Sequence, residues 1–196
     1  MAVIAITAWY ALGLQFYITV KDAATLVFYL TFFTILTNLL VAVGLTARLL
    51  MPPSKAGIFF SKQPVAAATA LYIVVVGLVY NAILRWLWKP EGLQLIADTL
   101  LHVAVPVMFL LYWLLFVPKG NLKYGNVFTW LWYPLSYLVY VLIRGAIVNE
   151  YPYPFIDVTA LGYPKMLLNS GAMLVVFLGL GLLFVFVGRQ SKQRPQ

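Results

Sequence analysis

The chain has 196 residues, of which 64% are hydrophobic and only 9% are charged, and its mean hydropathy is +0.95. A soluble domain carries about a quarter charged residues, so this composition excludes an ordinary soluble protein and predicts a membrane protein. The net charge of +8 has no soluble surface to carry it, so we expect the lipid bilayer as partner and no nucleic acid. Cysteine is absent and histidine occurs once, so we expect no disulfide, no metal and no other cofactor.

Six apolar segments reach the ~20 residues that cross the hydrocarbon core of a bilayer. In chain order they are residues 2–20, 25–49, 64–88, 94–117, 124–148 and 164–188. Continuous apolar runs without two-residue alternation indicate helices rather than a barrel. We therefore predict an all-α, polytopic protein: one six-helix transmembrane domain over residues 1–188, followed by a basic tail over residues 189–196. The first segment lacks a basic start and a small-residue cleavage site, so it is interpreted as a retained span rather than a signal peptide.

The charged residues predict the orientation of the bundle. The segments after spans two, four and six contain basic residues and no acid: Arg48, Lys55, Lys62, Lys119, Lys123, Arg189, Lys192 and Arg194. The other connections hold all five acids, balanced by five basic residues. Because basic loops stay in the cytoplasm, we expect both termini on the cytoplasmic side.

Polar residues inside a span face the bundle interior, since lipid does not solvate them. In span two, Thr31, Thr34 and Asn38 lie on one helix face by their spacing. For the two threonines, the simpler interpretation is helix packing, with hydroxyls bonded to helix carbonyls. The Asn38 amide needs more partners than a hydroxyl and makes a functional interpretation more attractive.

Span four contains His102, the only histidine, one helical turn after Asp98. At ~1.5 Å per residue, Thr34 lies about 13 Å and His102 about 12 Å from the outer ends of their spans. The two side chains would therefore face one another if spans two and four are neighbours. Two interpretations of His102 stay open: a functional titratable group, or a hydrogen-bonded interior residue.

Arg144 and Asp157 bracket a proline-rich loop between spans five and six. Two interpretations are open for them as well. They form an ion pair that fixes the loop to the bundle, or Arg144 belongs to a cationic mouth that captures a lipid carboxylate or phosphate.

Four segments carry a resemblance to a known family: FFTILTNLLVAVG (32–44), LLHVAVPVMFLLYWLLFVPKG (100–120), WYPLSYLVYVLIRGAIVNEYPYPFIDV (132–158) and LGYPKMLLN (161–169). Together they resemble the bacterial Pr6Pr family of six-helix membrane proteins. The resemblance implies an integral, multi-pass protein of the bacterial cytoplasmic membrane. One departure is Tyr112, which stands where that family usually has aspartate.

More distantly, the chain is similar to the androgen-induced and androgen-dependent TFPI-regulating membrane proteins. Those are threonine hydrolases that cleave fatty acid esters of hydroxy fatty acids with an intramembrane Thr and His. Thr34, in Phe32-Phe33-Thr34, matches their threonine motif best, and Thr31 is a rival alignment of the same motif. His102 is the only residue that can supply the histidine.

Three hypotheses follow. The first is an intramembrane lipid-ester hydrolase with Thr34 as nucleophile, His102 as general base, Asp98 orienting the imidazole and Asn38 donating to the oxyanion, with Thr31 and Arg144 as further supporting candidates. The alternative is a non-enzymatic protein that binds or senses a lipid or another hydrophobic ligand in the bundle. A proton-coupled channel or transporter is least favoured, because one titratable pair and no broken helix are seen. The distance from the Thr34 hydroxyl to the His102 ring separates the first hypothesis from the others. Substrate and oligomeric state stay open.

Overall fold

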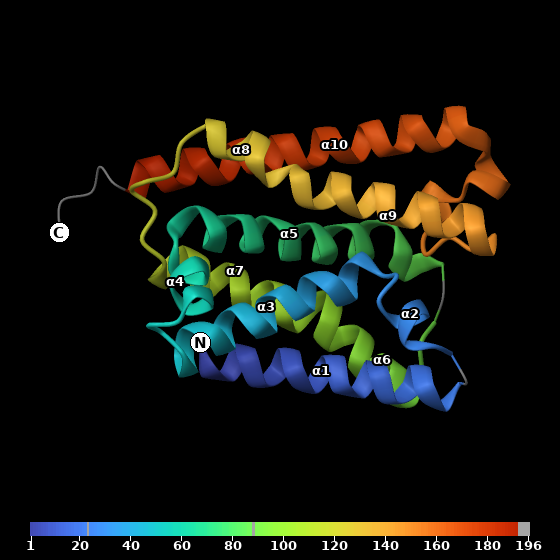
Figure 1. Cartoon of the computed structure of the whole chain (residues 1–196), viewed down its shortest axis with the longest axis horizontal. Helices are drawn as coiled ribbons and strands as arrows, with labels where there is room; N and C mark the ends of the chain where they lie inside the picture. The colour runs from blue at the N-terminus through green and yellow to red at the C-terminus, as the bar shows by residue number, and fades with distance from the viewer. Residues whose placement is uncertain (23, 88, 192–196) are drawn as a thin grey trace. The chain divides into compact units, whose positions relative to one another are not determined.

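The computed structural model describes residues 1–22, 24–87 and 89–191, and the chain is helical over most of these ranges (Figure 1). Six helices are long and apolar enough to cross a membrane: Ala2–Lys21, Phe33–Leu50, Gln63–Trp86, Gly92–Phe116, Gly125–Val148 and Val158–Gln190. The predicted all-α fold with six spans is therefore confirmed. Lys192 and Arg194 of the predicted basic tail lie outside the described residues.

The chain divides into two compact units, Met1–Pro118 and Lys119–Gln196. The first unit contains, in order, α1 (Ala2–Lys21), α2 (Leu26–Tyr29), α3 (Phe33–Leu50), α4 (Lys55–Ser61), α5 (Gln63–Ala82), the 3₁₀ turn η1 (Leu84–Trp86), α6 (Gly92–Thr99), the π-helical turn η2 (Leu100–Ala104) and α7 (Val105–Phe116). The second contains α8 (Gly125–Trp130), α9 (Trp132–Val148), η3 (Pro154–Ile156) and α10 (Val158–Ser191).

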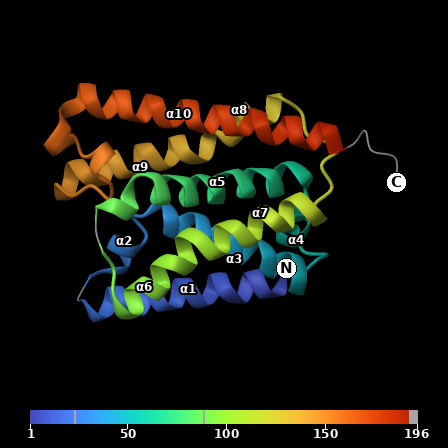
Figure 2. The same cartoon turned by 180° about the vertical axis from the view of Figure 1, so that it is seen from behind.

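In the first unit, α3 packs against both α1 and α5 (Figure 1). The continuous run α6–η2–α7 crosses this layer diagonally, so that α6 lies on α1 and α7 lies on α5 (Figure 2). Because η2 is in the middle of the crossing, it contacts α1, α3 and α5. Fully buried alanines such as Ala8, Ala11 and Ala67 permit close helix packing where lipid provides no hydrophobic driving force.

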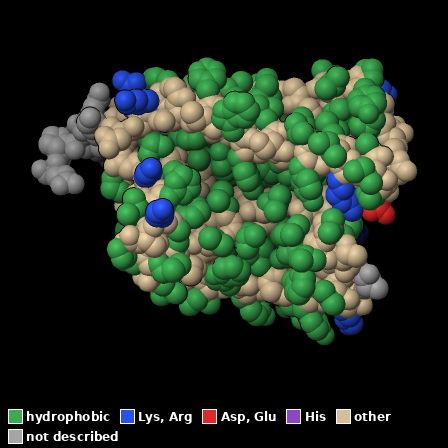
Figure 3. Space-filling view, in the orientation of Figure 1, with side chains coloured by type: hydrophobic (Ala, Val, Ile, Leu, Met, Phe, Trp, Pro, Cys, Tyr) green, Lys and Arg blue, Asp and Glu red, His purple; other side chains and the backbone are tan. Residues whose placement is uncertain are grey.

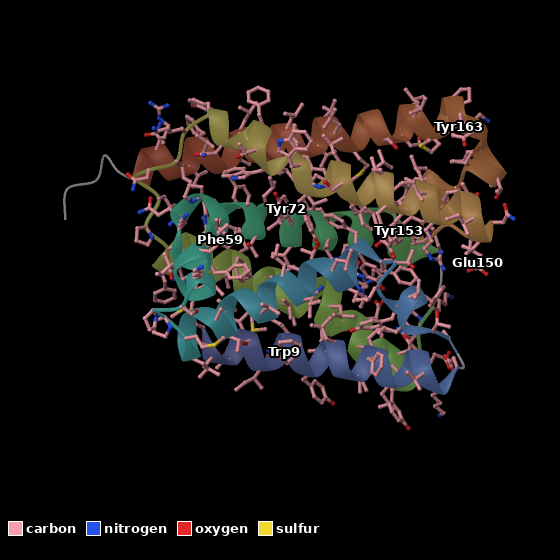
Figure 4. All side chains as sticks on the ribbon, in the orientation of Figure 1. Trp9, Phe59, Tyr72, Glu150, Tyr153 and Tyr163 are labelled. Atoms are coloured by element: carbon pink, nitrogen blue, oxygen red, sulfur yellow. The ribbon has the colours of Figure 1, made fainter. Side chains whose placement is uncertain are left out.

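Hydrogen bonds also join the helices of the first unit. Trp9, labelled in Figure 4, donates from its indole Nε1 to the Thr46 hydroxyl at 3.0 Å, joining α1 to α3. The side-chain amides of Gln15 and Gln94 donate to each other at 3.3 and 2.8 Å, joining α1 to α6. Paired amides satisfy polar groups that a lipid environment would leave unsolvated.

The sequence predicts one continuous span over residues 25–49, but the structure does not form one continuous helix there. The span breaks between α2 and α3, where Phe32 is extended with φ −84° and ψ 129°. The Thr25 hydroxyl accepts from the Phe28 N–H, and the Thr31 hydroxyl donates to the Val27 carbonyl. Threonine and aromatic residues favour helices weakly, because hydroxyls compete for backbone groups and bulky side chains lose rotamers. The prediction was wrong at residues 30–32, and as a consequence Thr34 lies in the first turn of α3.

The fourth span contains a π-helical turn that was not predicted. The Val105 N–H donates to the Leu100 carbonyl, a spacing of five residues, and Pro106 follows without an N–H of its own. Such a turn inserts one residue into the helix and rotates the side chains on either side of it relative to each other. His102 lies in the middle of this turn.

In the second unit, α10 begins at Val158, earlier than the predicted residue 164, and bends at Gly162, whose φ is 71°. The early start has a clear cause. Asp157 Oδ1 accepts from the Thr159 hydroxyl at 2.6 Å and from the Thr159 and Ala160 N–H groups at 2.9 and 3.1 Å. A carboxylate at this position satisfies the open N–H groups of the first turn.

The helices expose apolar surface of the kind that lipid covers. Hydrophobic side chains occupy most of the face in Figure 3. On α1, for example, Val3 and Ile6 are 69% and 68% exposed. A water-soluble protein rarely leaves so much apolar surface uncovered. The six apolar helices and this surface together fit an integral, multi-pass membrane protein.

Candidate functional site

A cluster of polar side chains lies inside the first unit, where the diagonal run crosses α3 and α5. Its members are Thr34 from α3, Tyr80 from α5, Asp98 from α6 and His102 from η2. Thr34, Tyr80 and Asp98 are 8%, 5% and 4% exposed, and the His102 side chain is 12% exposed. Burying polar groups in an apolar bundle costs free energy unless they bond to one another.

Thr34 and His102, which the sequence placed at similar depth in their spans, are in contact. Thr34 Oγ1 lies 3.3 Å from His102 Nε2. This distance is slightly above the 2.6–3.2 Å range of a short catalytic hydrogen bond. Thr34 also lies in the first turn of α3, where the helix dipole favours negative charge.

The other nitrogen of the imidazole is held by Asp98. His102 Nδ1 lies 2.9 Å from the Asp98 carbonyl oxygen and 3.3 Å from its Oδ1. A carbonyl oxygen only accepts hydrogen bonds, so Nδ1 must carry the proton of the neutral ring. Nε2 then has a lone pair, and that lone pair faces the Thr34 hydroxyl. Asp98 therefore orients the imidazole through both its backbone and its side chain.

Tyr80 was not among the residues that we expected at the site. Its hydroxyl donates to Asp98 Oδ2, and its ring stacks on the His102 ring with centroids 3.9 Å apart and an angle of 16°. One signal in the sequence does indicate this neighbour. Tyr80 and Asp98 are each nine residues from position 89 in the tight loop between two antiparallel spans, so they lie at equal depth.

The backbone around His102 is also supported from α5. Because Pro106 has no N–H, the His102 carbonyl lacks the donor that an α-helix would provide four residues later. Asn81 Nδ2 donates to this carbonyl at 3.4 Å and to the Gly77 carbonyl at 2.8 Å. A Cβ on Gly77 would lie 3.2 Å from the His102 oxygen, so glycine permits this close approach.

Asn38 joins the two halves of the cluster. It is fully buried, and its Nδ2 donates to the Thr34 carbonyl at 2.9 Å and to the Leu101 carbonyl at 3.3 Å. Both amide hydrogens are therefore used, and Asn38 does not present a donor to an oxyanion in this arrangement. Its Oδ1 is buried without a hydrogen-bond partner among the described residues. The side chain thus holds α3 against η2, next to the Thr34–His102 contact.

Thr31 and Arg144 have other hydrogen-bond partners in the structure. The Thr31 hydroxyl donates to the Val27 carbonyl at 2.8 Å, which fits the packing interpretation, and the hydroxyl that meets His102 belongs to Thr34. Arg144 belongs to the second unit. It donates to the Glu150 carbonyl at 3.2 Å and pairs with the Glu150 carboxylate at 3.7 Å, so the acid that pairs with it is Glu150 rather than Asp157.

Within the described ranges, no group of three His, Cys, Asp or Glu side chains could hold a metal ion. The fold defines the class of the protein, an integral, multi-pass α-helical membrane protein. Comparison with protein-family models, curated proteins and solved structures finds no match for the chain.

Proposed function

We propose that the protein is an intramembrane lipid-ester hydrolase in which Thr34 is the nucleophile and His102 the general base. One observation carries the proposal. Asp98 fixes the proton of the imidazole on Nδ1, and this directs the basic lone pair of Nε2 at the Thr34 hydroxyl. A threonine hydroxyl is a weak nucleophile on its own and needs such a base.

The reaction proceeds in two halves. Thr34 Oγ attacks the ester carbonyl while its proton moves to His102 Nε2. The tetrahedral intermediate then expels the alcohol, which takes that proton and leaves an acyl-threonine. In the second half, Nε2 accepts a proton from water as the water attacks the acyl group. Collapse of that intermediate returns the proton to Thr34 and releases the carboxylic acid.

The surroundings of the pair support this chemistry. The positive end of α3 stabilises negative charge that develops beside Thr34. Asp98, held in turn by the Tyr80 hydroxyl, stabilises the imidazolium that forms. The apolar bundle suits an acyl chain delivered from the bilayer. The resemblance favours a fatty acid ester of a hydroxy fatty acid as substrate and a place in the bacterial cytoplasmic membrane. The distribution of basic residues favours both termini in the cytoplasm.

The test is hydrolysis of a lipid ester by the full chain in nanodiscs. We expect Thr34→Ala and His102→Ala each to reduce turnover by at least ~100-fold, as loss of a nucleophile or its base does. Thr31→Ala is the matched control, since it removes a hydroxyl that donates to the helix backbone, and it should retain turnover. Undiminished turnover in the Thr34 and His102 variants would exclude this mechanism.

One observation favours a second candidate function, the binding of a lipid without turnover. Among the described residues, the buried Oδ1 of Asn38 is an acceptor without a partner, and both amide hydrogens are already used. A ligand that supplies a hydroxyl or amide donor would satisfy this atom. Recovery of an intact ester bound to the purified protein, with no acid released over hours, would support this candidate over the hydrolase.

A further inference from the structure

Arg85 lies one helical turn beyond Asn81, in the 3₁₀ turn η1 that follows α5. It is exposed, and one of its terminal nitrogens donates to Asn81 Oδ1 at 3.1 Å. The Asn81 amide in turn donates to the His102 carbonyl. The guanidinium is therefore joined through a single side chain to the backbone of the proposed general base.

Arg85 forms no ion pair with an acidic side chain in the described part of the chain. Among the described residues, the ion pairs are His102 with Asp98 and Arg144 with Glu150. A guanidinium has five N–H donors in a planar fork, and the bond to Asn81 uses one of them. The remaining donors match the geometry of a carboxylate or phosphate, which they can bind through two parallel hydrogen bonds.

We propose that Arg85 binds the acidic group of an amphiphilic ester, a carboxylate or a phosphate, while the ester bond lies against Thr34. This inference depends on the hydrolase proposed above, and it assigns the class of substrate. Asn81 contacts the turn that contains His102, and Arg85 donates to Asn81. The preferred substrate therefore carries an acidic group in addition to its ester, with the acyl chain in the bilayer.

Substrate preference tests the assignment. With an ester that carries such an acidic group, Arg85→Gln should lower kcat/KM about 10- to 100-fold, mainly through KM, since a charge-assisted bidentate contact is lost. With a neutral ester of the same chain length, the loss in the variant should be at least several-fold smaller. Arg85→Lys keeps the charge without the fork and should be intermediate. Lys89→Gln is the matched control, because it removes an exposed positive charge from the same connection, and it should leave both substrates unaffected.

A binding measurement separates failure of this inference from failure of the hydrolase. The full chain in phosphatidylcholine nanodiscs is titrated with cis-parinaric acid and with its uncharged methyl ester. The acid should bind about tenfold more tightly than the methyl ester to the wild type and to Lys89→Gln. Arg85→Gln should bind the acid and the methyl ester with equal affinity. If this result is obtained but no ester is hydrolysed, the role of Arg85 in ligand binding is supported and only the hydrolase proposal is refuted.

Two competitors identify the source of the acidic group. Dodecyl phosphate should displace the probe from the wild type, whereas inorganic phosphate at the same concentration should not. Equal competition by inorganic phosphate would overturn the assignment to an amphiphile. Equal binding of acid and methyl ester by the wild type, or the same loss in the Arg85 and Lys89 variants, would overturn the role of Arg85 itself.

Discussion

Replacement of Asn38 by leucine separates stability from alignment at the candidate site. Leucine has nearly the shape of asparagine but cannot form its two hydrogen bonds, to the Thr34 and Leu101 carbonyls. The bond to the Leu101 carbonyl joins two helices, and such bonds contribute about 0.6 kcal/mol on average and at most about 1.7. The bond to the Thr34 carbonyl lies within α3, so the total loss is roughly 1–2 kcal/mol. The substitution also removes the buried Oδ1 that has no partner, which relieves about 1–3 kcal/mol.

These two effects nearly cancel, so we expect Asn38→Leu to change the free energy of unfolding by no more than about 1 kcal/mol. Activity should respond differently. Without the amide, the link from the Thr34 carbonyl through Asn38 to the Leu101 carbonyl is lost. Hydrolysis should therefore fall at least ~10-fold, since small misplacements of reacting groups are costly.

The assay measures unfolding in mixed sodium dodecyl sulfate micelles together with ester turnover in nanodiscs. The control is Thr69→Val, which removes another buried polar group, a hydroxyl that donates to the Val65 carbonyl on α5. It should leave turnover intact. A loss of 3 kcal/mol or more for Asn38→Leu would show that Oδ1 has a partner, and full turnover at wild-type stability would refute the alignment role.

Three further predictions follow from the same geometry. Tyr80→Phe removes the hydroxyl that donates to Asp98 but keeps the ring stacked on His102, so turnover should fall about 10-fold. Turnover of Tyr80→Leu should fall further, and equal turnover in Tyr80→Phe and the wild type would contradict this. Gly77→Ala places a Cβ 3.2 Å from the His102 carbonyl and should slow turnover, whereas Gly13→Ala, with nothing within 4 Å of its Cβ, should not. In the second unit, a threonine hydroxyl and two N–H groups of α10 hold the pKa of Asp157 below its usual 3.8. The Asp157 carboxylate therefore contributes stability above pH 3.8, and this contribution is lost as the pH falls through the lower pKa of the folded protein. The free energy of unfolding of Asp157→Asn should vary less between pH 5 and pH 2 than that of the wild type.

The sequence predicted the number and class of the spans because a membrane imposes its thickness on apolar segments. The same constraint allowed the depth of a residue to be counted, and the counts placed Thr34 and His102 at similar depth without establishing that their helices are neighbours. Asp98 was expected to orient the imidazole from its position one turn before His102, and the structure places its carbonyl and carboxylate oxygens beside Nδ1. The spans contain few polar side chains, so few pairs of them had to be considered as contacts.

Counting residues along the spans could not predict local irregularities of the backbone. The break before Phe33 depends on a hydroxyl that bonds to the backbone within its own turn, and hydropathy does not register such a bond. The π-helical turn around His102 depends on packing against three other helices and on a proline that only weakly signals it. The sequence predicts that Asn38 donates to an oxyanion, but its amide donates to the Thr34 and Leu101 carbonyls. The direction of an amide depends on which carbonyls lie nearby, and the sequence does not show that.

The most direct test of the central claim is to locate the residue that a fluorophosphonate modifies. The full chain in nanodiscs is treated with the probe, digested and sequenced by tandem mass spectrometry. Attack by the activated oxygen expels fluoride and leaves a phosphonate ester, which we expect on Thr34 in the wild type and on no residue in His102→Ala. Modification at Thr31, or modification of Thr34 that persists without His102, would contradict the proposed threonine–histidine pair.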